Sequence, residues 1–309
     1  MKKSPPHSDL LLKRATYASV GVALVLVCGK LAAWLLTGSL TVMASMVDSL
    51  MDAASSTINL LAVRWSLNPA DEDHRFGHGK AEFLAGLAQA SFIAGSAFFL
   101  LVHAFERLRN PTPVTQVTTG LIIMTLAIAA TLSLLAYQKL VIRKTGSMAI
   151  RGDALHYATD VLTNLGTIAA LLLAKCPGLD PALALIIDPV FAIIIAGYIL
   201  YSAVRIGYEA GQMLMDRELP PEIREEIIRI ARTPPQVQGV HDVRTRQSGQ
   251  TMMIQLHLEL EDHLPLVRAH GIARAVEKEI LRSWPCADVI IHQDPAELAK
   301  KTERNEAGV

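Results

Sequence analysis

The sequence predicts an all-α membrane bundle of six transmembrane helices, followed by a small α+β domain. Hydrophobic residues make up 51% of the chain and charged residues only 19%, less charge than ordinary soluble proteins carry. The apolar residues gather in runs of about 20, the length that a helix needs to cross the hydrocarbon core of a bilayer. After about residue 209 the chain instead shows the short helical and alternating patterns of a water-soluble domain.

Six apolar segments are long enough to span a membrane. They cover residues 15–36, 40–63, 82–105, 118–142, 149–174 and 182–208. Basic residues cluster before the first segment, between the second and third, and between the fourth and fifth, so the positive-inside rule predicts that both termini are cytoplasmic. The basic start followed by an apolar run resembles a signal peptide, but no small-residue cleavage site follows, and we expect a retained first helix.

We therefore expect a transmembrane domain over residues 1–208, a cytoplasmic domain over 209–295 and a disordered polar tail over 296–309. The cytoplasmic domain has the predicted order α-β-β-α-β. Its first helix, PPEIREEIIRIAR, has proline at its start and isoleucines at helical spacing. A hairpin with alternating apolar residues, a second helix and the strand ADVIIHQD follow.

Two pairs of polar residues lie inside apolar segments. Asp48 and Asp52 belong to the second segment, and His156 and Asp160 to the fifth. Each pair has i, i+4 spacing, so both of its side chains point to the same side of a helix. A carboxylate at mid-bilayer costs about 2.5–3.5 kcal/mol even on the lenient insertion scale, so these acids need compensation. If the two helices pack face to face, one imidazole and three carboxylates converge.

That set of side chains suits a divalent cation. Four nitrogen and oxygen ligands fit tetrahedral Zn²⁺, and Cd²⁺ or Fe²⁺ less selectively. The absence of Cys and Met from the set argues against Cu(I), and Ca²⁺ and Mg²⁺ prefer more oxygen ligands. For a single buried acid the alternative is an ion pair, and Lys30 in the first segment is an available partner. Two pairs on two segments favour the metal site.

Other features exclude several classes of protein. The 29 basic residues balance the 29 acidic ones, so no nucleic-acid partner is indicated. The three cysteines stand far apart, which argues against a disulfide framework or a thiolate metal site. We expect no enzyme and no organic cofactor, because four protein ligands leave no open position for a catalytic water and no HExxH or phosphate-binding loop occurs. His103, alone in the third segment, is expected to be a packing or interface histidine.

Six motifs occur along the chain: VDSLMDAASS, FGHGKAE, LHYATDVLTN, LMDRELP, HDVRTRQSG and VIIHQDP. Together they resemble those of the cation diffusion facilitator family, and more narrowly its bacterial zinc and ferrous-iron efflux pumps, from about residue 10 to 295. The resemblance implies a homodimer in the bacterial inner membrane that exchanges a cytoplasmic divalent metal for an external proton by alternating access. It also implies a metallochaperone-like cytoplasmic domain. Its transport site would be Asp48, Asp52, His156 and Asp160.

The resemblance implies two further metal sites. In the loop DEDHRFGHGK, Asp71, His74 and His78 have ligand-like spacing, although without the resemblance a solvated polar loop is the better interpretation. The second site bridges the cytoplasmic domains of two protomers, and metal bound there favours the assembled form because it binds only that form. Its predicted ligands are His241, His257, His270, His292 and Asp294.

The resemblance also pairs Lys80 with Asp216 as a hinge salt bridge. Such a pair needs partial burial, because an exposed ion pair contributes only about 0–1 kcal/mol. The chain departs from the family in KCPGLDPALALIIDP, which is longer than the usual external turn. The start of the sixth segment and the role of Asp188 therefore stay open.

The sequence thus predicts a proton-coupled divalent metal exporter. Metal and protons compete for the same ligand atoms, so binding inside releases protons and protons outside expel the metal. The cargo stays open among Zn²⁺, Fe²⁺, Cd²⁺, Co²⁺ and Mn²⁺, as does the proton stoichiometry. The alternative is a metal sensor that signals through its soluble domain, although a sensor has no need of ligands inside the membrane.

Overall fold

The computed structural model describes residues 6–37, 40–110, 117–174 and 181–297. The chain divides into two compact units. One is a helical unit of residues 7–68 and 80–211. The other, the mixed unit, contains the loop 69–79 and residues 212–297.

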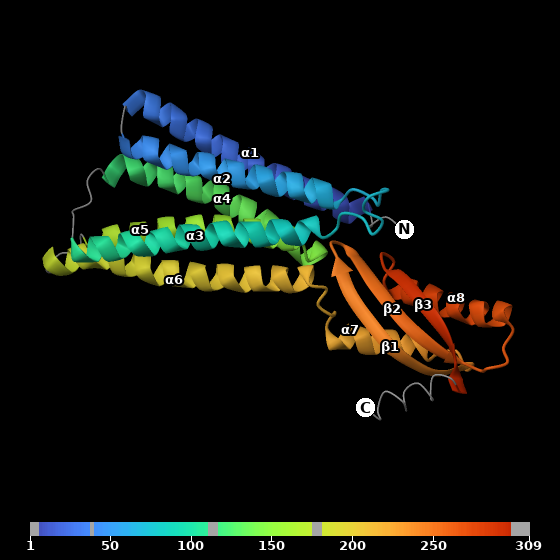
Figure 1. The fold of residues 1–309 in the computed structure, drawn as a ribbon. Coiled ribbons are helices and arrows are strands. Elements are labelled where there is room, and N and C mark those ends of the chain that lie inside the picture. The colour runs from blue at the N-terminus through green and yellow to red at the C-terminus, as the bar shows by residue number, and fades with distance from the viewer. Residues whose placement is uncertain (1–5, 38–39, 111–116, 175–180, 298–309) are drawn as a thin grey trace. The chain divides into compact units, whose positions relative to one another are not determined.

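Long helices build the helical unit (Figure 1). Each of the six predicted apolar segments lies inside one of them, and the sixth helix begins at Pro181. Because α5 packs against α2, α3 and α4, it is the central helix of the unit. The bounds are α1 (Pro6–Thr37), α2 (Leu40–Ser66), α3 (Ala81–Arg109), α4 (Val117–Thr145), α5 (Met148–Ala174) and α6 (Pro181–Leu214).

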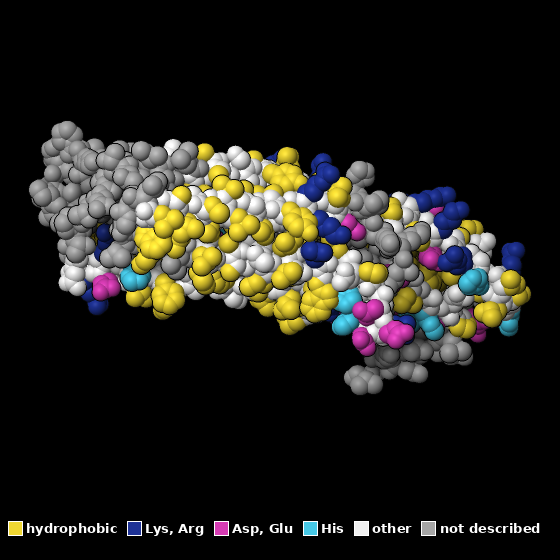
Figure 2. Space-filling model, turned by 90° about the horizontal axis from the view of Figure 1, so that it is seen from above, with side chains coloured by type: hydrophobic (Ala, Val, Ile, Leu, Met, Phe, Trp, Pro, Cys, Tyr) yellow, Lys and Arg dark blue, Asp and Glu magenta, His cyan; other side chains and the backbone are white. Residues whose placement is uncertain are grey.

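Among the described residues, three helices are long and apolar enough to cross a membrane. These stretches are Ser8–Ala32, Ala81–Arg109 and Pro189–Leu214. Large apolar side chains also lie exposed on the unit, including Leu35, Phe98, Phe99 and Ile194, and Figure 2 shows hydrophobic side chains spread along it. So much exposed apolar surface is typical of a region covered by lipid or by another chain. That α2, α4 and α5 also cross the membrane stays a prediction.

Polar contacts fix the first turns of α5. Glu82, which is buried at the start of α3, accepts a hydrogen bond from the backbone N–H of Met148 at 3.0 Å. This contact satisfies an N–H that has no partner within the helix and places negative charge at the positive end of the helix dipole. One turn later Arg151 forms an ion pair with Glu209 of α6 at 2.8 Å. The cytoplasmic-facing end predicted for α5 is thus tied to two neighbouring helices.

A fully buried polar cluster surrounds Asp153, three residues before His156 on α5. Asp153 accepts hydrogen bonds from Ser19 Oγ of α1 at 2.5 Å and from Gln138 Nε2 of α4 at 2.7 Å. Ser56 Oγ of α2 lies 3.4 Å from the same carboxylate. Buried polar groups of this kind are costly unless each finds a partner, so the cluster fixes how four helices meet.

The mixed unit holds one sheet in the order β1-β2-β3. Its strands are β1 (Val237–Ser248), β2 (Thr251–Leu260) and β3 (Asp288–Pro295), with β1 antiparallel and β3 parallel to β2. Helices α7 (Pro221–Ala231) and α8 (Leu266–Ser283) join the sheet in a common apolar core. The predicted order α-β-β-α-β is confirmed. Since neighbouring side chains alternate along a strand, the buried Leu256 and Leu258 leave His257 and Glu259 on the opposite face.

The loop 69–79 packs on the β1–β2 turn within the mixed unit. A Cβ on Gly79 would collide with the carbonyl oxygen of Ser248, so only glycine allows this approach. The guanidinium of Arg246 also lies over the ring of Phe76, 5.6 Å from its centre. The loop is therefore part of the unit that contains the sheet, although residues 80–236 separate it from the first strand in sequence.

We expect Asp153→Ala to lower the thermal stability of the protein in detergent. It removes the buried carboxylate that accepts hydrogen bonds from Ser19 and Gln138, at a cost of about 1–3 kcal/mol. Asp153→Asn keeps one acceptor oxygen and should cost less. The measurement is the unfolding midpoint by circular dichroism, with Asp73→Ala, in the exposed loop, as the control. An Asp153→Ala midpoint equal to that of the control would contradict the role assigned to the cluster.

Candidate metal centres

Three of the four predicted transport-site ligands converge inside the helical unit. His156 Nε2 on α5 lies 3.1 Å from Asp52 Oδ1 on α2 and 4.0 Å from Asp160 Oδ2, one turn further along α5. The ligand atoms of these three residues all lie within 4.8 Å of one another. Asp48 belongs to α2, but its side chain lies outside the described residues, and its place in the set stays a prediction.

The buried imidazole of His156 lies close to two carboxylates without a well-formed hydrogen bond to either. His156 Nε2 is inaccessible to solvent and takes part in none of the hydrogen bonds among the described residues, although Asp52 is near. Two carboxylates so close to one nitrogen repel each other unless a cation or proton lies among them. The rings of Phe92 and Tyr157 contact the imidazole edge to face, with centroids at 6.3 and 5.5 Å, and limit its rotation. These side chains fit a divalent cation.

A cavity of about 840 Å³ opens on this site. Its polar wall includes Lys30, Ser49, Asp52, His103, His156 and Asp160. His103, expected to be a packing or interface histidine, is largely exposed, lines this cavity and has its Nδ1 3.8 Å from Glu106 Oε2. A lone histidine gives no spacing signal, so its position could not be read from the sequence.

The predicted loop site is assembled in the mixed unit. Asp71 Oδ1 accepts hydrogen bonds from the backbone N–H groups of Asp73 and His74, at 3.1 and 2.6 Å. Asp71 Oδ2 lies 3.3 Å from His78 Nε2, and the rings of His74 and His78 are 4.5 Å apart. The hydrogen bond from the His74 backbone, with the nearby histidines, lowers the pKa of Asp71. An ionised carboxylate beside two imidazoles fits a metal ion.

The third group of ligands forms a row across the sheet. His241 on β1 pairs with His257 on β2, and His257 pairs with His292 on β3. Asp294 reaches all three: its Oδ2 lies 2.8 Å from His257 Nδ1 and 3.4 Å from His241 Nε2, and its Oδ1 lies 3.1 Å from His292 Nε2. Ligand atoms of His241, His257 and Asp294 lie within 4.8 Å of one another, and with His292 beside them they fit Zn²⁺ or a similar ion.

Three predicted residues, His270, Asp216 and Lys80, are not among the ligands of these groups. His270 lies exposed on α8, and the cluster of His241, His257 and Asp294 does not include it. Asp216 has a left-handed backbone and pairs with Arg246 at 3.0 Å within the mixed unit. Lys80 belongs to the helical unit, and its pairing with Asp216 stays a prediction.

The sequence interpretation missed two acids beside the row of histidines. Glu259 Oε1 forms a hydrogen bond with His241 Nδ1 at 2.9 Å. Asp242 Oδ2 lies 3.7 Å from His257 Nε2. Acids in such positions fix the orientation of ligand histidines. The alternation along β2 that places His257 on the face away from the core also places Glu259 there, so Glu259 could have been found from the sequence. Asp242 lies at an irregularity of β1 that no sequence pattern indicates.

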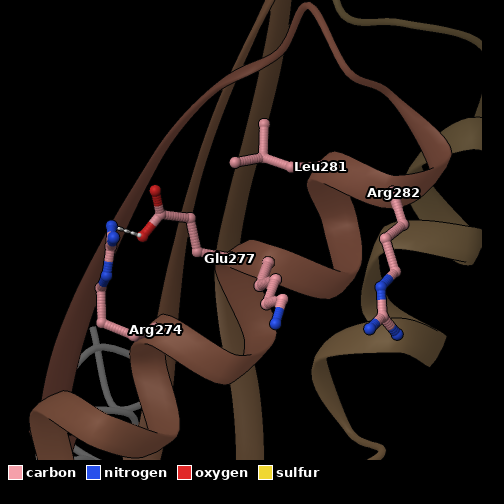
Figure 3. Close-up of a pocket in the computed structure, with 5 residues that line it drawn as sticks. Arg274, Glu277, Leu281 and Arg282 are labelled. Atoms are coloured by element: carbon pink, nitrogen blue, oxygen red, sulfur yellow. Dashed lines mark hydrogen bonds and ion pairs between the residues drawn. The ribbon is translucent and has the colours of Figure 1, made fainter.

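The mixed unit also has a hollow, which residues of α8 line (Figure 3). Its lining is Arg274, Glu277, Lys278, Leu281 and Arg282. Arg274 donates a hydrogen bond to Glu277 at 2.5 Å, and Glu277 is the one acidic residue among those that line the hollow. Three basic side chains around one paired acid repel cations, so this hollow is no metal centre.

Comparison with known families shows which kind of protein carries these three groups of ligands. The cation efflux transmembrane domain matches residues 16–215, and the cytoplasmic domain of cation efflux proteins matches residues 219–296. The chain belongs to the cation efflux family. The family resemblance seen in the motifs is thereby confirmed.

Relatives within the cation efflux family match over almost the whole chain. The cation-efflux pump FieF of Citrobacter koseri is 50% identical over 291 residues, 94% of this chain and 95% of that protein. FieF of Klebsiella pneumoniae is 49% identical over 294 residues, 95% and 96% of the two chains. A solved structure of CzrB, described as a zinc transporter, is 28% identical with a TM-score of 0.24 and covers 26% of this chain and 92% of that one. The relatives are efflux pumps, which confirms that this family member is not an enzyme.

We expect His257→Ala and Glu259→Ala to weaken metal binding at the row of histidines. The first removes a ligand, and the second removes the partner that orients His241, a loss that typically costs about 10- to 100-fold in affinity. Zn²⁺ titration of the full chain by calorimetry measures both. His263→Ala is the control, because His263 is an exposed histidine outside the three groups. Unchanged binding by His257→Ala would show that the row holds no metal.

Proposed function

We propose that this member of the cation efflux family exports divalent metal cations by exchanging them for protons. The observation that carries the proposal is the convergence of Asp52, His156 and Asp160 on one point inside the helical unit, beside a cavity. Ionisable groups within membrane helices are rare and mark pathways for ions or protons. Here two helices contribute them to the same point, which an ion in transit can occupy.

Exchange follows from the chemistry of the ligands. An imidazole nitrogen and carboxylate oxygens bind either a proton or a metal ion, so a metal can bind only as protons leave. When the cavity faces the cytoplasm, the metal displaces protons. When it faces a more acidic exterior, protons displace the metal. Alternating access to one site therefore couples the two gradients without nucleotide hydrolysis.

The ligand set favours Zn²⁺, with Cd²⁺ and Fe²⁺ as further cargo. Imidazole suits zinc and iron, and the mixture of nitrogen and oxygen ligands matches four-coordinate Zn²⁺. The site has no soft sulfur ligand among Asp52, His156 and Asp160 that would select Cu(I). Zn²⁺ and Fe²⁺ differ too little in ligand preference for the set to separate them.

We further propose a homodimer with six membrane spans per protomer and both termini in the cytoplasm of the bacterial cell, in the inner membrane. Each of α1 to α6 has at least 27 residues, and about 20 suffice to span the hydrocarbon core. The row of histidines supports dimerisation, because His292 is 63% exposed and a second protomer can supply further ligands, including His270. A metal sensor is not favoured, since it has no use for ligands inside the membrane.

We expect Asp52→Ala and His156→Ala to reduce Zn²⁺ flux to background in proteoliposomes, because each removes a ligand that neighbouring residues cannot replace. A zinc-sensitive fluorophore trapped in the vesicles records the flux. Asp262→Ala and His263→Ala are matched controls that change the same residue types outside the candidate sites. Flux at the wild-type rate in both ligand variants would refute the transport site.

Proton coupling is tested on the wild-type protein. Vesicles that are acidic inside should accumulate Zn²⁺ faster than vesicles without a pH difference, because protons leaving the vesicle drive the metal in. Reversing the pH difference should slow uptake. A rate that does not depend on the pH difference, at equal external pH, would show that metal moves without proton exchange.

A further inference from the structure

Lys30 brings a fixed positive charge to the cavity of the transport site. It lies on α1, half-buried, and its Nζ donates a hydrogen bond to Ser49 Oγ of α2 at 2.7 Å. Ser49 is 2% exposed and precedes Asp52 by three residues, so the two side chains are neighbours on one helix face. Lys30, Ser49, Asp52, His156 and Asp160 all line the same cavity.

With the predicted ligand Asp48 included, the formal charges around this cavity match one divalent ion. Asp52 and Asp160 contribute two negative charges, and Asp48 adds a third if it joins the site as predicted. The ammonium of Lys30 cancels one of the three. Two negative charges then remain, and a single divalent cation neutralises them. Without Lys30 the loaded site would keep one negative charge in surroundings where an uncompensated charge is expensive.

We propose that Lys30 is the counter-cation of the transport cavity, opposing the bound metal and balancing the carboxylates once the metal has left. This inference rests on the proposed function. The ammonium is a compact charge on a flexible four-carbon stem, so it can approach the acids without leaving α1. It repels a metal ion bound beside it and lowers the cost of the emptied site. Lys30 thereby weakens binding and speeds release, and transport needs an ion that binds and also leaves.

The competing role for Lys30 is purely structural. Its hydrogen bond to Ser49 joins α1 to α2, and loss of that contact could distort the site without any electrostatic effect. The two roles predict opposite changes in apparent affinity. A distorted site binds metal more weakly, whereas a site relieved of a nearby positive charge binds it more tightly.

The experiment measures Zn²⁺ flux against Zn²⁺ concentration for the full chain in proteoliposomes. A nearby charge changes the proton affinity of a group by about 10- to 1000-fold, and a doubly charged ion responds at least as strongly. We therefore expect Lys30→Met and Lys30→Gln to lower KM at least about tenfold and also to lower kcat, because release becomes slower. Lys30→Arg keeps the charge and should retain the wild-type KM.

Two control variants separate charge from contact. Ser49→Ala removes the hydrogen bond but leaves the ammonium in the cavity, so it should not lower KM as the neutral Lys30 variants do. Lys13→Met removes a lysine exposed elsewhere on α1 and should change nothing. An unchanged or raised KM in both neutral Lys30 variants, or a Ser49→Ala variant that behaves like them, overturns the inference while leaving the transporter assignment intact. Absence of flux in the wild-type protein would instead refute the proposed function.

Discussion

Charge held inside an apolar helical unit is the constraint on which the rest of the structure depends. His156 and its two acids can stay together only where each charge has a partner, so α2 and α5 must keep their positions closely. Contacts outside the site hold α2 and α5 in these positions. Glu82 fixes the first turn of α5, and Asp153 ties it to three other helices. Much of the buried polar chemistry of the helical unit therefore serves to place one helix.

The convergence of Asp52, His156 and Asp160 could be predicted from sequence because helical periodicity alone places both members of an i, i+4 pair on one side. The supporting residues could not. Asp153, Ser19 and Gln138 come from three helices and have no mutual spacing, so nothing along the chain indicates that they meet. The apolar segments predicted the helices well for a similar reason: length and composition are local properties, whereas helix partners are not.

The same distinction holds in the mixed unit. Alternation predicted the hairpin and placed His257 on its outer face, but the pairing of His241, His257 and His292 depends on strand register across the sheet. The loop 69–79 is a stronger case. Its ligand spacing is visible in the sequence, yet its place on the β1–β2 turn follows from Gly79 meeting Ser248, a contact between distant positions. The helices before and after this loop belong to the helical unit, so the sequence order alone does not indicate that the loop belongs to the mixed unit.

The surroundings of each buried acid separate structural from exchangeable sites. Asp153 is enclosed by hydroxyl and amide donors whose charge never changes, and these donors stabilise it without an ion. Asp52 instead faces the imidazole of His156 and a cavity that Lys30 also lines, and in the proposed mechanism its partner changes between a proton, a metal and the ammonium. A carboxylate with fixed neutral donors has one low-energy state, whereas one with interchangeable cations has several of similar energy. Asp153 on α5 and Asp52 on α2, two buried acids of one helical unit, therefore differ in role: the first holds helices together, and the second belongs to the site proposed to release its ion.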